Sequence, residues 1–96
     1  MEASEIYLID RVQTGVRIEK RLLKVLKGLA EYCDLTLGDL LEGIVLHALE
    51  GKCALGAETL VQVGALKKIY GLDLTAEASH RLKEKTSRMQ KNEEGE

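Results

Sequence analysis

The chain has 96 residues, enough for one domain, and 45% of them are apolar, which excludes a chain disordered by composition. It contains no Phe, Trp or Pro and three Tyr, which argues against the base stacking used by RNA and single-strand binders. The net charge of −2 hides a basic stretch over residues 11–27 and an acidic stretch over residues 31–58. We therefore expect one surface that faces a polyanion and one that faces solvent or a partner, with ordinary solvated faces as the alternative.

The sequence also bears on the compartment. Two cysteines are too few for a disulfide framework, and no secretory leader is visible. No segment approaches the roughly 18 consecutive apolar residues of a membrane span. We therefore expect a cytoplasmic protein.

The N-terminal part carries the most informative pattern. Residues 6–9 form an apolar run that either extends the strand that follows or lies as an arm over the core. Residues 12–18 alternate between the two faces of an extended strand. One face holds Val12, Thr14, Val16 and Ile18, and the other holds Gln13, Gly15 and Arg17. Because no later segment reads as a second strand, we predict that the pairing strand comes from another copy of the chain.

Residues 19–33 are predicted to form the first helix, because apolar residues recur there at helical spacing. This apolar stripe consists of Leu22, Leu23, Leu26, Leu29, Ala30 and Cys33. Lys20, Lys24 and Lys27 form a second stripe, which is either a solvated face or a binding patch. Gly28 weakens the helix by about 1 kcal/mol relative to Ala, so it marks either a close approach or a neutral surface position.

A second helix is predicted from Thr36, its N-cap, to about residue 50, where Gly51 stops it. Its wide apolar face comprises Leu37, Leu40, Leu41, Ile44, Val45, Ala48 and Leu49. Leu46 falls among the acidic residues of the opposite face. It is either a single exposed leucine or a position that the C-terminal region covers.

The C-terminal part is predicted to hold two further helices. The third covers residues 57–70, ends at Gly71 and packs on the core, with Leu46 as one position that it could cover. Its best apolar face holds Leu60, Val63, Leu66 and Tyr70. The fourth runs from Thr75 to about residue 90 and is the more mobile. Its inward candidates are Ala78, Leu82 and Met89.

The order strand, helix, tight turn, helix resembles the ribbon-helix-helix (MetJ/Arc-type) family of DNA-binding proteins. The likeness lies in residues 14–18 (TGVRI), 22–30 (LLKVLKGLA) and 34–41 (DLTLGDLL), and it covers about residues 12–50. The resemblance implies a mainly α fold in which one short strand pairs across a homodimer. Residues 1–50 would form the dimerisation and DNA-binding core, and residues 51–96 a helical extension with a frayed tail.

The family likeness also implies site residues. The outward strand side chains would enter the major groove, where Arg bonds guanine and Gln bonds adenine. These base-contacting residues are Gln13, Gly15 and Arg17. The start of the second helix would hold a phosphate on Thr36, Leu37 and Gly38, helped by Lys20, Arg21 and Lys24. The dimer core would consist of Val12, Val16, Ile18, Leu22, Leu26, Leu40, Leu41 and Ile44.

These residues predict a sequence-specific duplex DNA-binding protein, either a small transcriptional regulator or an antitoxin-like repressor of its own operon. In the second case a protein partner would bind residues 51–96. The alternative is a homodimer that serves as an interaction or structural module without DNA binding. Gly15, which offers no reading side chain, Leu37 at the phosphate position, and the acids Asp39 and Glu42 favour that alternative.

Catalysis and metal binding find little support in the sequence. His47 and His80 are isolated, and His47 is expected at the boundary of a helix core. Cys33 reads as a small core residue. Together with Cys53 these residues lack the close ligand pairs of zinc sites, and no phosphate-binding glycine motif occurs. We therefore expect no enzymatic activity, no metal and no cofactor.

Overall fold

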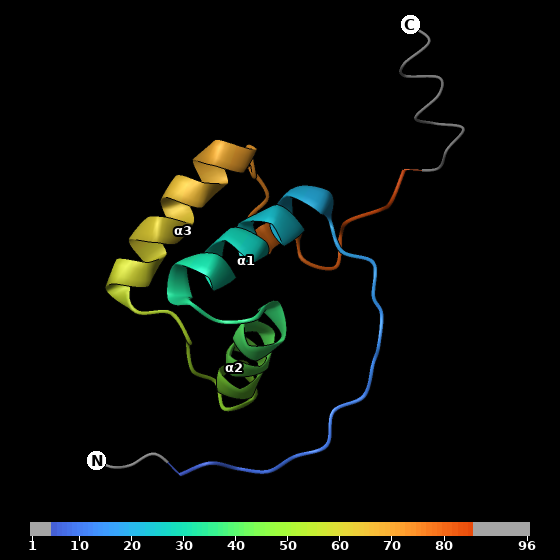
Figure 1. Ribbon diagram of the computed structural model, residues 1–96. Helices are drawn as coiled ribbons and strands as arrows, with labels where there is room; N and C mark the ends of the chain where they lie inside the picture. Colours follow the sequence, from blue (N-terminus) through green and yellow to red (C-terminus); the bar gives the residue numbers. More distant parts are fainter. Residues whose placement is uncertain (1–4, 86–96) are drawn as a thin grey trace, which may run out of the picture.

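The computed structural model describes residues 5–85 and consists of three α-helices and one short 3₁₀ turn (Figure 1). These elements are α1 (Lys20–Cys33), α2 (Leu37–Leu49), α3 (Ala57–Tyr70) and η1 (Ala76–Ala78). The prediction of a mainly helical chain is confirmed, and residues 5–85 contain no strand. α1 lies in the middle and packs on α2 and on α3. No helix among the described residues is long and apolar enough to cross a membrane.

Local capping chemistry explains where the helices begin and end. Glu19 caps α1 by accepting a hydrogen bond from the Leu22 N–H at 2.8 Å. Thr36 caps α2 in the same way, with its hydroxyl oxygen 3.1 Å from the Asp39 nitrogen. Gly71, at φ 68°, ends α3 in the left-handed conformation that glycine adopts without strain. The three predicted helices are therefore confirmed to within one residue at their ends.

The core lies where α1 meets its two neighbours. Within residues 5–85 five apolar residues are buried: Val25, Leu29, Ala30, Leu40 and Leu72. Leu29, Ala30 and Leu40 form one cluster, against which pack the partly buried Leu26, Cys33, Ile44, Leu55, Val63 and Leu66. Val25 is buried although the predicted stripe omits it, and α1 packs on two neighbours. The C-terminal part contributes to this core through α3 and Leu72.

Gly28 is a point of close approach between α1 and α3. A Cβ added to Gly28 would lie 2.9 Å from Leu66 Cδ2, inside the distance that real Cβ atoms show. The sequence left close approach and a neutral surface position open, and the structure decides for close approach. Glycine at position 28 lowers the helix propensity of α1, but its missing side chain leaves the space that Leu66 occupies against α1.

One expectation about the C-terminal part is wrong, and the open question about Leu46 is decided for a single exposed leucine. Thr75 starts only η1, and residues 79–85 are not helical, because His80 takes a left-handed φ of 65° and Leu82 finds no apolar neighbourhood to bury it. The rest of the predicted fourth helix, including Met89, lies outside the described residues. α3 does not cover Leu46, which stays 65% exposed because α3 packs on α1.

A larger side chain at position 28 tests the close approach. We expect Gly28→Leu to lower the free energy of unfolding by about 1–3 kcal/mol, since it overpacks the contact with Leu66. Gly43→Ala, on α2 with open space around the added Cβ, is the matched control and should raise stability by up to about 1 kcal/mol. Urea unfolding followed by circular dichroism measures both, and an undiminished stability of Gly28→Leu would contradict the packing.

Candidate nucleic-acid interface

The predicted ribbon segment is extended and open to solvent on both faces. Every residue from 5 to 18 is exposed, and Val12 and Val16 are 85% and 76% exposed. Figure 1 shows this segment running outside the three helices. An extended chain that keeps apolar side chains in water has no partner for them within the described part of the same chain.

The eight residues predicted for the dimer core fall into two groups. Leu40 is buried and Leu26, Leu41 and Ile44 are partly buried, so these four already contribute to the core of one chain. The remaining four are exposed: Val12, Val16, Ile18 and Leu22. A single chain therefore buries, at least in part, four of the five helical residues of the predicted set and leaves the three strand residues and Leu22 exposed.

Arg11 ties the N-terminal segment to α2. Its guanidinium donates two hydrogen bonds of 2.8 Å to the Glu42 carboxylate and one of 3.3 Å to Asp39. The bond from Arg11 lowers the pKa of Glu42 below its usual range. The two acids near the start of α2 thus have a cation beside them, which reduces the negative charge that would repel a phosphate there.

Arg17, the predicted guanine reader, is paired with Glu84 of the C-terminal segment. Both side chains are exposed, and hydrogen bonding to Arg17 lowers the pKa of Glu84. An exposed pair of this kind is weak and is screened by salt. The pair therefore holds Arg17 in place without burying it.

Arg21 is engaged by the body of the protein. It donates to the carboxylates of Glu19, at 2.9 Å, and Asp73, at 3.0 Å, and to the Gly71 carbonyl at 3.0 Å. The sequence predicted a phosphate contact for Arg21. In this structure Arg21 instead joins the start of α1 to the end of α3.

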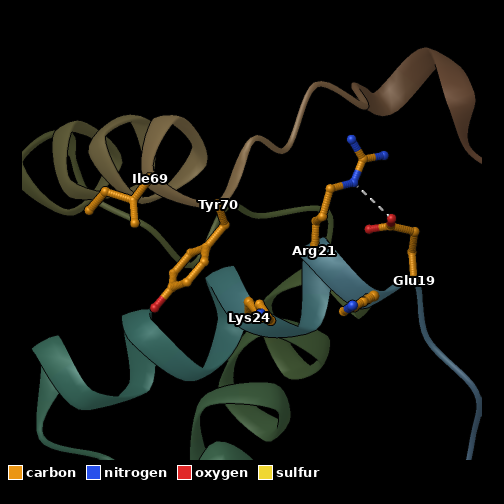
Figure 2. A pocket seen from close by; sticks show the side chains of 6 residues that line it. Glu19, Arg21, Lys24, Ile69 and Tyr70 are labelled. Atoms are coloured by element: carbon orange, nitrogen blue, oxygen red, sulfur yellow. Dashed lines mark hydrogen bonds and ion pairs between the residues drawn. The ribbon is translucent and has the colours of Figure 1, made fainter.

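The basic end of α1 forms a shallow pocket of about 460 Å³ against the end of α3 (Figure 2). It is lined by Glu19, Lys20, Arg21, Lys24, Ile69 and Tyr70. The Lys24 ammonium lies 5.8 Å from the centre of the Tyr70 ring, within cation–π range. Lys20 and Lys24 are exposed on this side of α1 and can meet an anion.

The start of α2 is the second predicted phosphate position. The Thr36 hydroxyl accepts the Asp39 N–H, so Thr36 is a helix cap as expected. The N–H groups of Leu37 and Gly38 belong to the first turn, where a helix has no carbonyl of its own to offer them. Lys20 and Thr36 lie at opposite ends of α1, whose 14 residues span about 20 Å. The two predicted phosphate positions therefore lie apart on one chain.

The remaining candidates have structural surroundings. His47 is exposed on α2, and its ring nitrogen Nδ1 lies 2.8 Å from the Gly43 carbonyl oxygen. Cys33 is partly buried and packs against the core. Cys53 is exposed. His80 sits in the irregular C-terminal segment. Within residues 5–85 no group of three or more His, Cys, Asp or Glu could hold a metal ion.

Sequence reasoning missed the partners of the three arginines. Glu42, Glu84 and Asp73 lie 31, 67 and 52 residues from the arginines that they bind, and no local pattern predicts contacts at such separations. Only the acidic character of α2 gave a signal, and it had been interpreted as a feature that opposes DNA binding.

Removing each arginine tests these pairings. We expect Arg11→Gln to raise the pKa of Glu42 toward its ordinary value and leave the pKa of Glu84 lowered, and Arg17→Gln to do the reverse. Because the pKa of each carboxyl group is lower in the folded chain than in the unfolded one, each group stabilises the fold fully at pH values above its unfolded-state pKa. This stabilisation is lost as the pH falls through the lowered pKa of the folded state. Carboxyl-carbon NMR titration measures both groups in each variant, and equal shifts in both variants would contradict specific pairing.

No family model, curated protein or solved structure matches this chain. The function is therefore argued from its residues and their geometry.

Proposed function

We propose that the chain is a sequence-specific duplex DNA-binding protein that acts as a homodimer, as a small transcriptional regulator or an antitoxin-like autorepressor. The observation that carries the proposal is the extended segment of residues 12–18. It holds Val12 and Val16 in water on one face and Gln13 and Arg17 on the other, and residues 5–85 supply no strand to pair with it.

Burial of apolar surface supports a second copy as the pairing partner. Fully burying a Val or Leu side chain gains about 1.5–3 kcal/mol, and the described part of one chain, residues 5–85, buries only five apolar residues. Antiparallel pairing of two copies would cover Val12, Val16 and Ile18 of each. The exposed Val45 and Leu49 of α2 would add to the same shared core.

One register consistent with the alternation places the two-fold axis at Gly15, the middle of the segment. Gln13 of one copy then lies opposite Arg17 of the other on the outward face. Gly15 of both copies then lies at the centre, where the absent side chains let the ribbon approach the floor of the groove. The ribbon would read two half-sites, each with one Arg suited to guanine and one Gln suited to adenine.

Phosphate binding would come from Lys20 and Lys24 and from the first turn of α2 behind Thr36. Arg21 is held by Glu19 and Asp73 and contributes less than its position suggests. With roughly three or four phosphates neutralised per copy, the logarithm of the binding constant would fall with that of salt concentration at a slope of about −5 to −7.

The dimer is tested by sedimentation equilibrium at micromolar concentration. We expect the wild-type chain to be larger than a monomer and Val16→Asp to reduce its mass, because a buried charge opposes pairing of the inward face. Gln13→Asp, which places the same charge on the outward face, is the matched control and should keep the mass. A folded wild-type monomer would contradict the ribbon.

DNA binding is tested by gel shift with the duplex that flanks the gene, at low and moderate salt. Arg17→Ala should lose about 5- to 150-fold in discrimination between specific and random duplex, the effect of one bidentate base contact. Glu84→Gln should bind more tightly than wild type, since it releases Arg17. Arg81→Ala is the control for Arg17→Ala, because it removes the same charge from an exposed arginine in the C-terminal segment.

No retardation by an intact dimer at low salt would overturn the DNA proposal. The rival function, a protein-interaction module, is favoured by the absent side chain at Gly15 and by the Glu84 carboxylate on Arg17. That rival predicts no change in partner binding for Arg17→Ala. A toxin-like neighbouring gene would support an antitoxin role for residues 51–96.

A further inference from the structure

α3 is apolar on both of its sides. Its inner side places Val63 and Leu66 against the core. Its outer side carries Val61 and Ile69, each 69% exposed. Figure 1 shows α3 on the outside of α1, with its far side uncovered by the other helices. A surface helix normally has one apolar side, so a second apolar side with large exposed residues calls for an occupant.

The outer side is an ordered ridge. Ala57, Val61, Ala65 and Ile69 follow one another at intervals of four residues, which lines side chains up along a helix surface. All four are exposed. The space around Gly64, where an added Cβ would meet nothing within 4 Å, leaves room for a close approach.

The ridge also has opposite charges at its two ends. Glu58 lies in the first turn of α3 and Lys68 in the last turn, and both are exposed. They are placed symmetrically about position 63, as are Val61 and Ala65, and Ala57 and Ile69. Each pair thus joins a large residue to a small one or an acid to a base.

We propose that this face binds the same face of a second copy, with the two α3 helices antiparallel about a two-fold axis at position 63. Val61 then packs against the partner's Ala65, Ile69 against the partner's Ala57, and Glu58 approaches the partner's Lys68. A two-fold interface requires a surface that is complementary to itself, and this ridge meets that condition in size and in charge. Parallel pairing would set Glu58 against Glu58 and is excluded by repulsion.

This interface lies apart from residues 12–18 and does not depend on the proposed function. If the ribbon forms as well, each chain has two different two-fold contacts. Two such contacts assemble four copies into a closed tetramer when their axes intersect at a right angle. A DNA-binding dimer would thereby be joined to a second one through α3.

Charge reversal tests the interface. Sedimentation equilibrium should show that Glu58→Lys and Lys68→Glu each weaken self-association by about tenfold or more, because like charges then face each other. The double variant E58K/K68E should restore association, since the charges are exchanged but complementary. Lys27→Glu reverses the charge of an exposed residue of α1, away from the ridge, and should not change self-association. Circular dichroism checks that each variant keeps its helices.

Val61→Asp provides a second test on the apolar part of the ridge. We expect it to halve the assembled mass while the helical spectrum is retained. An unchanged mass for Val61→Asp and Glu58→Lys would overturn the proposal, as would a double variant that stays as weak as the single ones. The ribbon test with Val16→Asp removes a different contact, so failure here leaves the DNA proposal standing and the reverse also holds.

Discussion

The structure depends on α1 packing on two neighbours at once. Val25, Leu29 and Ala30 of this helix are buried, and Gly28 lets Leu66 of α3 approach its backbone. A helix with two buried sides has little surface left for solvent, and its lysines lie on what remains. The core that results has five buried apolar residues within residues 5–85, and it leaves many apolar side chains of those residues exposed. The proposed self-association would relieve that imbalance, because a small chain gains most by sharing a core.

Electrostatic contacts link the irregular segments to the helices and to each other. Arg11 of the N-terminal segment reaches α2, Arg17 reaches Glu84 of the C-terminal segment, and Arg21 of α1 reaches Asp73. In each of the three ion pairs at least one of the two side chains is exposed to solvent. Such pairs are weak, so they orient the segments while allowing the arginines to exchange partners. A surface held in this way can release an arginine to another anion without breaking the core.

The helices could be predicted from the sequence because their ends are local. Thr36 caps α2 three residues ahead of the N–H that it accepts, and Gly71 stops α3 at its own position. The mainly helical class follows from these elements. The fourth helix failed because Leu82 had no apolar surface to meet, and that surface depends on how distant helices pack. The arginine partners were beyond prediction for the same reason, since tertiary folding alone brings Arg17 and Glu84 together. The ribbon and its DNA contacts remain predictions.

Leu72 has a consequence for Arg17 beyond its place in the core. It is buried immediately after α3, so the residues that follow are anchored at one end and reach Glu84 after twelve positions. Because this short segment keeps Glu84 on the same chain as Arg17, the effective concentration of the Glu84 carboxylate near Arg17 is on the order of millimolar. Any external anion must compete with that local concentration, so dilution of the protein does not free Arg17. The Glu84 carboxylate is thus a competitor for Arg17 whose effective concentration does not depend on the protein concentration.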